Sequence, residues 1–294
     1  EYIYKFVSKN RYQPGNRAAN MRLLEEGTLY AARFNENGSG DWLALVHGQN
    51  GLTAANGFAD QGEVLVKTRM AADLVGATKM DRPEWITADP FTAGSIYCTL
   101  TNNSQRGEAG KPAADAANPR ANNLFGHIIH WQEADGDGTK LSFKWDILVL
   151  AGNKQAAKPE HKGNINGDDF GSPDGLAFDN RGVLWIQTDV STSTLNMKEY
   201  AGMANNQMVA TVLGSNEYRR FLTGPNGSEI TGIAFTPDNK TMFINIQHPG
   251  EPSKGDSDPA RPTAVSTWPD GAAAGRPRAA TVVITKNDGG VIGS

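Results

Sequence analysis

Three windows of this 294-residue chain share one pattern, and this repetition limits the possible folds more than any other feature. The windows are 84–101, 174–189 and 231–246. Each has a short apolar segment, then a turn rich in Asp, Pro, Gly or Asn, then a second segment that is almost entirely apolar or aromatic. Turn residues between two β-rich segments indicate a hairpin. Its recurrence predicts an all-β fold made of β-propeller blades.

The rest of the chain supplies further strands, one short helix and two long loops. Strands are predicted at 1–8, 27–34, 42–46, 126–131, 141–150, 208–212, 217–222 and 281–284. Apolar residues at helical spacing predict the helix over 63–75. The segments 104–122 and 251–278 are rich in Ala, Gly and Pro and are predicted to be long surface loops. No internal boundary is visible, so residues 1–294 are expected to belong to one domain.

Composition excludes several classes of protein. The net charge is −4, with 28 Lys and Arg against 32 Asp and Glu, which argues against a nucleic-acid-binding surface. No apolar stretch approaches the roughly 18 residues of a membrane-spanning helix. The single cysteine, Cys98, lies within a predicted strand and is expected to be a buried core residue. The chain begins inside a predicted strand without Met, so we expect a mature or truncated product.

Common catalytic and metal motifs are missing from the sequence. There is neither a Gly-x-Ser-x-Gly elbow nor a Walker loop, and the five histidines lack zinc-binding spacing. The acidic run at 135–139 resembles the start of a calcium loop, but it has no glutamate at the twelfth position and is predicted to be a hairpin turn. His248 follows a predicted strand and could line a central pore, but no role is assigned to it.

Acidic residues recur at the start of the repeated hairpins. Glu84 and Asp174 occupy equivalent positions, and Glu229 is offset from the third repeat position, which is Thr231. Pro83 favours an extended residue before it, so Arg82 and Glu84 are expected on the same side of a strand. A radial array of such strands would gather these carboxylates around one axis, where they would bind cations.

Ordinary explanations of the same residues remain open from the sequence alone. Arg82 and Glu84 could form an exposed ion pair at the start of a strand. Asp174 could simply be a turn residue, and Glu229 could be a solvated loop glutamate. Propellers also often only bind partners, so a non-enzymatic interaction module is a further hypothesis.

Longer blocks resemble the PhoX-type alkaline phosphatases along nearly the whole chain. They are DRPEW (81–85), YCTLTNNS (97–104), ANPR (117–120), GHII (126–129), SPDG (172–175), LWIQTD (184–189), NNQM (205–208), RRFLTGP (219–225), GIAFTPD (232–238) and NIQHPG (245–250). The resemblance covers the C-terminal half of a typical member. It implies that the chain is the C-terminal part, over 1–294, of a six-bladed propeller. The absent N-terminal half would supply further ligands, including a cysteine ligand to iron.

The resemblance also implies a function. Family members hydrolyse phosphomonoesters with calcium and ferric ions at the central pore and are exported by the twin-arginine route, which predicts a periplasmic or secreted protein. The substrate arginine of the family falls on Arg82, a metal-binding glutamate on Glu84 and a metal ligand on Asp174. Glu229 is predicted as a third metal carboxylate. The alternative enzyme is a calcium-dependent propeller lactonase or esterase, because a block like 173–179 followed by a Gly-x-Leu-Trp hairpin occurs there too.

Overall fold

The computed structural model describes residues 1–215, 217–253, 257–271 and 275–294, and all the sheets in it are antiparallel. The first sheet has the order β1-β2-β3-β7-β6-β5-β4. Its strands are β1 (Tyr4–Ser8), β2 (Gly27–Phe34), β3 (Ser39–Ala44), β4 (Pro83–Ala88), β5 (Ser95–Leu100), β6 (His127–Glu133) and β7 (Ser142–Leu150). The second sheet, in the order β11-β10-β9-β8, contains β8 (Pro173–Phe178), β9 (Val183–Thr188), β10 (Gln207–Val212) and β11 (Arg219–Thr223). The third, in the order β12-β13-β14, contains β12 (Glu229–Phe235), β13 (Thr241–Gln247) and β14 (Ala280–Thr285).

The three repeated windows form the hairpins β4–β5, β8–β9 and β12–β13, as predicted. The first strand of each hairpin lies innermost, and β8 contacts both β4 and β12. Each first strand also carries a register shift close to its start. These shifts lie between Pro83 and Ile86, between Pro173 and Leu176, and between Thr231 and Ile233. The repeat therefore extends to backbone geometry, since an extra residue bends each strand at the same place.

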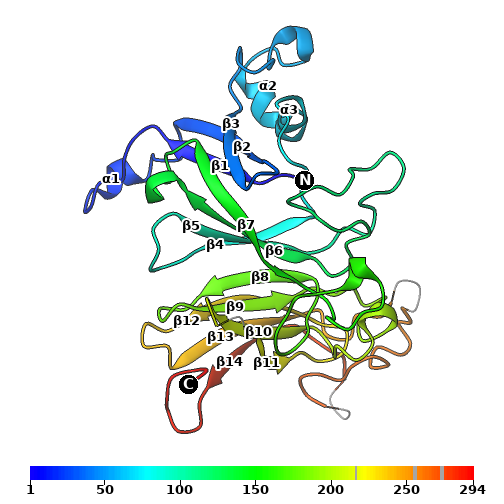
Figure 1. Ribbon diagram of the computed structural model, residues 1–294. Coiled ribbons are helices and arrows are strands. Elements are labelled where there is room, and N and C mark those ends of the chain that lie inside the picture. Colours follow the sequence, from blue (N-terminus) through cyan, green and yellow to red (C-terminus); the bar gives the residue numbers. More distant parts are fainter. Residues whose placement is uncertain (216, 254–256, 272–274) are drawn as a thin grey trace.

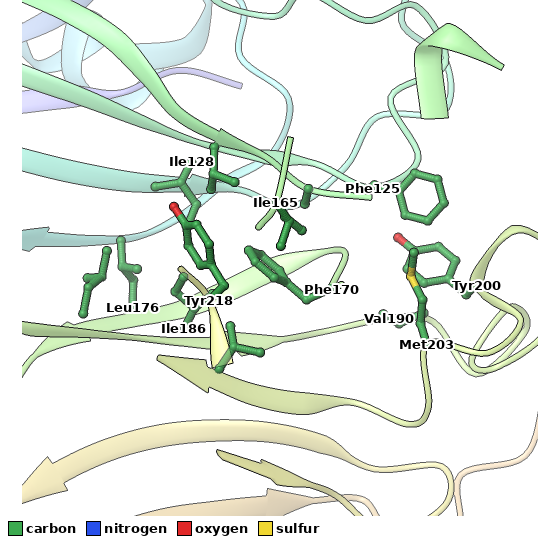
Figure 2. Close-up of a cluster of buried hydrophobic side chains, with 14 of the residues drawn as sticks. Phe125, Ile128, Ile165, Phe170, Leu176, Ile186, Val190, Tyr200, Met203 and Tyr218 are labelled. Atoms are coloured by element: carbon green, nitrogen blue, oxygen red, sulfur yellow. The ribbon is translucent and has the colours of Figure 1, made fainter. Parts of the chain in front are cut away.

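The second sheet lies between the other two, and β1–β3 extend the first sheet on its far side (Figure 1). Side chains between the first and second sheets form a continuous apolar core (Figure 2). It includes Phe125, Ile128, Ile165, Phe170, Leu176, Ile186, Val190, Tyr200, Met203 and Tyr218. A second core, which includes Trp185, Met208, Ile230, Met242, Ile244 and Ile246, joins the second and third sheets. Because side chains alternate between the two faces of a strand, one face of β13 is buried against the second sheet.

The opposite face of the third sheet is open. Phe243 is 37% exposed and Val283 is 58% exposed, and the two residues are paired across β13 and β14. On the edge strand β4 of the first sheet, Ile86 is 50% exposed. Apolar residues at strand positions normally lie against another layer. The two outer sheets of the stack therefore have apolar surface that the described residues leave uncovered.

The helical prediction over 63–75 differs in detail from the structure. Two helices, α2 (Gln61–Val66) and α3 (Thr68–Leu74), occupy this segment, and they are separated at Lys67, whose φ of −94° and ψ of 32° are not helical. Asp60 caps α2 by accepting a hydrogen bond from the Glu63 backbone N–H. Helix α1 (Arg17–Asn20) is not predicted because four residues are too few to give a helical repeat.

The segment 104–122 contains neither helix nor strand, as predicted, but it does not lie wholly at the surface. Arg106, Asn118 and Arg120 are all buried. Arg120 donates from its Nη1 to the carbonyl oxygen of Ala151 at 2.7 Å and from its Nη2 to that of Gly126. Sequence composition predicted the loop but not the buried polar residues that attach it to the rest of the fold. The other predicted loop, 251–278, lies partly outside the described residues.

The architecture is mainly β and propeller-like, with three blade-like sheets among the residues that the structure describes. The total of six blades stays a prediction. None of the helices among the described residues has the length and apolar character needed to cross a membrane.

Candidate functional site

The starts of β4, β8 and β12 bring three predicted carboxylates together. Glu84 and Asp174 are the second residues of β4 and β8, and Glu229 is the first residue of β12. The carboxylates of Glu84 and Glu229 both raise the pKa of Asp174, so these side chains share one electrostatic environment. The innermost position of the three strands thus gathers acidic groups that are far apart in sequence. Their roles as metal ligands stay predictions.

The acidic cluster lacks matching positive charge. Burial and the neighbouring carboxylates of Glu84, Glu229 and Asp189 raise the pKa of Asp174 to about 7, against the lowering effect of Arg82. Burial also raises the pKa of Glu84, and burial together with Asp189 raises that of Glu229. Like charges held close together in a partly buried site disfavour ionisation. Such a cluster would be stabilised by bound cations.

Arg82 lies beside this cluster at the start of β4. Its Nη2 is 3.6 Å from Oε1 of Glu84, and its Nη1 donates to Oδ1 of Asn102 at 3.1 Å. The side chain is 45% exposed. A guanidinium carries five N–H donors, so these contacts leave donors for an anion. Its planar fork suits two oxygens of a phosphate group.

The backbone of Arg82 is held in the left-handed region, with φ of +54°, so the extended conformation predicted from Pro83 is wrong. Its carbonyl oxygen accepts from the Thr101 backbone N–H at 3.1 Å. The residue before it, Asp81, is fully buried. The Asp81 carboxylate accepts hydrogen bonds from Nε of Arg106 at 2.5 Å, Nδ2 of Asn103 at 2.9 Å and Nδ2 of Asn123 at 2.9 Å. This buried network fixes the chain immediately before Arg82 and supports its unusual conformation.

Asp189 belongs to the same cluster but was not predicted as a site residue. It follows β9, and its backbone N–H donates to the carbonyl oxygen of Ser172 at 2.9 Å. Burial raises its pKa, and Arg82 and His248 lower it. The signal in the sequence is its place at the end of the second window, because hairpin pairing returns that end to the start of β8 beside Asp174.

His248 also lies at the site, where the sequence suggested the pore without a role. Its Nε2 is 3.6 Å from Oε2 of Glu229, and its Nδ1 is 3.4 Å from Oε2 of Glu251. Nε2 of Gln247 donates to Glu229 at 2.8 Å. Glu229 is therefore held by two neighbours at the end of β13, which argues against a freely solvated loop residue.

A cavity of about 830 Å³ adjoins this end of the molecule. Its mainly polar wall includes Thr192, Asn196, Asn205, Asn226, Glu251 and Arg261. Glu251 contacts His248, so the cavity adjoins the acidic cluster. Its volume is in the usual range for small-molecule sites.

The donor atoms at the cluster suit hard cations. Glu84, Asp174, Asp189 and Glu229 offer carboxylate oxygens, the ligands that Ca²⁺ prefers. Within the described ranges, however, no group of three His, Cys, Asp or Glu side chains is arranged to hold an ion by itself. Cys98, a residue of β5, is fully buried in an apolar core, and burial raises the pKa of its thiol, which confirms the predicted core role. The cluster fits part of a metal site, and the remaining ligands would come from elsewhere.

Sequence and structure comparisons identify related proteins. The sequence model of the family described as alkaline phosphatase PhoX matches residues 1–250. No curated protein matches the chain. A solved structure, Pseudomonas fluorescens PhoX in complex with the transition-state analogue vanadate, is 44% identical and aligns with a TM-score of 0.89. The alignment covers 99% of this chain and 50% of that one, so the chain spans about half the length of this relative. With the family match over residues 1–250, the chain belongs to the PhoX alkaline phosphatase family.

Proposed function

We propose that this chain is part of a metal-dependent alkaline phosphatase that hydrolyses phosphomonoesters and releases inorganic phosphate. The observation that carries the proposal is the position of Arg82 beside the acidic cluster. A cationic fork beside a cation-binding cluster can hold an anionic phosphate that the carboxylates alone would repel. Membership of the family and the vanadate complex of the relative point to the same chemistry.

Each residue has a defined task in this proposal. Arg82 binds phosphate oxygens and offsets the charge that develops there during P–O cleavage. Glu84, Asp174 and Glu229 hold the cations, and Asp189 is a further candidate. The bound ions would supply Lewis acidity and an activated oxygen nucleophile. His248 orients Glu229 and lowers the pKa of its carboxyl group.

We further propose that calcium and iron(III) are the ions and that residues 1–294 are the C-terminal part of one propeller domain. The all-oxygen donor set is consistent with both hard ions. The uncovered apolar surface at Phe243 and Val283 is consistent with further blades packing there. The absent half of the protein would complete the metal ligands, since the described carboxylates do not form a full site.

The test is to assay the full-length protein with p-nitrophenyl phosphate in the presence of calcium and iron. Arg82→Ala is expected to lower kcat/KM by about 10²–10³-fold, the usual effect of removing a preorganised group that stabilises developing charge. Arg33→Ala is a matched control, because Arg33 is 46% exposed and also pairs with a carboxylate, that of Asp41 at 2.9 Å. Hydrolysis that survives Arg82→Ala unchanged would contradict the role of this arginine.

Two other outcomes would replace the proposal. Turnover of a lactone panel without phosphatase activity would favour the lactonase alternative. A full-length protein that binds neither calcium nor iron and turns over neither substrate class would favour an interaction module.

The location of the protein is a separate proposal. Export by the twin-arginine route to the periplasm or medium is inferred from the family. Fractionation of cells that express the full-length protein tests it, and retention in the cytoplasm would contradict it.

A further inference from the structure

A chain of hydrogen bonds leads from the proposed phosphate-binding arginine into the core between two sheets. Nη1 of Arg82 donates to Oδ1 of Asn102 at 3.1 Å, and Nδ2 of Asn102 donates to Oγ of Ser172 at 3.2 Å. Oγ of Ser172 is 2.7 Å from the hydroxyl of Tyr200, which donates to the carbonyl oxygen of Leu124 at 2.6 Å. Asn102 follows β5 of the first sheet and Ser172 precedes β8 of the second. The chain therefore crosses the boundary between two blades.

The donor and acceptor of every hydrogen bond in this network are fixed by the groups at its two ends. The carbonyl oxygen of Leu124 can only accept, so the single hydroxyl proton of Tyr200 is used there. Tyr200 must then accept from the hydroxyl of Ser172, which in turn must accept from the amide of Asn102. That order leaves the Asn102 oxygen facing the guanidinium of Arg82. Bonds aligned in one direction polarise and strengthen one another.

The buried end of this hydrogen-bond network, at Ser172 and Tyr200, is tightly packed. Ser172 is 1% exposed and Tyr200 is 5% exposed, and the centroids of the Tyr200 and Phe125 rings are 4.6 Å apart (Figure 2). Gly171 makes this approach possible, because a Cβ atom there would lie 2.6 Å from the Tyr200 ring. The outer end is different, since Arg82 is a long side chain that is 45% exposed and would otherwise sample several rotamers.

We propose that Asn102 is a positioning residue that holds the Arg82 guanidinium toward the phosphate, anchored through Ser172 and Tyr200. This inference rests on the proposed function. It adds to that function a device that sets the arginine before substrate arrives, so that less side-chain entropy is lost on binding. Asn102 acts on the reaction through Arg82 and needs no contact with the substrate.

The experiment is a double-mutant cycle in the full-length protein with p-nitrophenyl phosphate as substrate. Asn102→Ala is expected to lower kcat/KM about tenfold and to weaken inhibition by inorganic phosphate in proportion, as for loss of a hydrogen bond to a charged group. Tyr200→Phe, which cuts the chain farther from the site, is expected to lower kcat/KM by about threefold. In an Arg82→Ala background neither change should reduce activity further, because the arginine through which both act is gone.

Controls separate positioning from a general effect on folding. Asn35→Ala is the matched variant, because Asn35 is half-buried and donates two side-chain hydrogen bonds of 3.0 Å, to Ser39 and Asp41, in a hairpin of the first sheet. It should leave kcat/KM unchanged. Thermal unfolding of every variant identifies any loss caused by instability.

Several results would overturn the inference. One is an Asn102→Ala effect that is as large in the Arg82→Ala background as in the wild type, and another is folded Asn102→Ala protein with wild-type kinetics. An inactive wild-type protein would defeat the proposed function instead. The positioning is then tested by a crystal structure of the Asn102→Ala variant, in which an unmoved and equally well-ordered Arg82 guanidinium would refute it.

Discussion

Adjacent residues of one segment, Asp81 and Arg82, belong to two different arginine–carboxylate pairs. The pair Arg106–Asp81 is buried, whereas the pair Arg82–Glu84 is partly exposed. Nε of Arg106 lies 2.5 Å from the Asp81 carboxylate, and the two side chains are 1% and 0% exposed. Nη2 of Arg82 lies 3.6 Å from the Glu84 carboxylate, and these side chains are 45% and 34% exposed. A neutralised and fully hydrogen-bonded buried pair has little capacity for a ligand. The exposed pair, Arg82–Glu84, keeps guanidinium N–H donors available for a ligand and lies among carboxylates that repel one another.

Two aspartates, the buried Asp81 and the half-buried Asp174, differ in the same way in how their negative charge is compensated. Asp81 accepts hydrogen bonds from Arg106, Asn103 and Asn123, so its negative charge is compensated within the fold. Asp174 is half-buried among Glu84 and Glu229, and burial together with these carboxylates raises its pKa to about 7. A buried carboxylate with donors around it maintains structure, whereas one with like charges around it indicates a site completed by a ligand.

The largest expected effect comes from breaking the buried pair. Arg106→Met removes the cation and leaves Asp81 buried without its charge partner, which should reduce the free energy of unfolding by about 3–5 kcal/mol. Urea denaturation measures this loss. The double variant Asp81→Asn/Arg106→Met should lose less than the sum of the two single changes, because it no longer buries an unpaired charge. Strict additivity would mean that the pair is not coupled as described.

The next effect sharpens the description of the acidic cluster as a cation site. Calcium at about 100 times its dissociation constant should stabilise the metal-depleted full-length protein by about 2.7 kcal/mol. The gain should be larger at pH 8 than at pH 5, because the ligands must be ionised. Asp174→Asn should reduce the gain, whereas Asp146→Asn, at an exposed carboxylate on β7, should not. Equal gains in both variants would exclude Asp174 from the site.

The sequence predicted the hairpins well because short apolar segments and the turn residues between them are local signals. It also placed Glu84 and Asp174 near one another, because a repeat converts equal positions in sequence into neighbours in space. Arg82 accompanies them because it lies only two residues before Glu84. Asp189 escaped prediction since its place depends on how the end of a hairpin returns to its start.

The anchors of the loop 104–122 could not be predicted for a different reason. Arg106 and Arg120 belong to a residue type that is normally exposed. They are buried because carboxylate and carbonyl acceptors from distant segments surround them. Such long-range polar contacts leave no periodic signal in the sequence.

A smaller effect tests the penalty for ionising the half-buried Asp174 in the absence of metal. The usual carboxyl pKa of 3.8 applies to the unfolded chain, and the folded value is about 7. Below pH 3.8 both states are protonated. As pH rises toward 7 only the unfolded state loses the proton, so folding becomes less favourable, and the penalty is complete above pH 7.

Removing this charge should therefore stabilise the metal-depleted protein at alkaline pH alone. Asp174→Asn is expected to raise stability at pH 8 by about 1 kcal/mol, a value that allows for solvent screening at a half-exposed group. At pH 3.5 the variant and the wild type should unfold alike. Thermal unfolding with a chelator present measures both conditions. Destabilisation at pH 8 would show that neither burial nor the neighbouring carboxylates disfavour the ionised form of Asp174 in the folded protein.

The smallest expected effect on stability comes from breaking the exposed pair Arg82–Glu84. Arg82→Ala should change the free energy of unfolding by less than about 0.5 kcal/mol, because an exposed pair at 3.6 Å contributes little to stability. The same substitution should strongly reduce phosphatase activity, so a large kinetic loss with near-wild-type urea denaturation is the expected combination. Arg106→Met is the contrasting variant, with its primary loss in stability. If Arg82→Ala unfolded as readily as Arg106→Met, Arg82 would be a structural residue, and the distinction between the two pairs would fail.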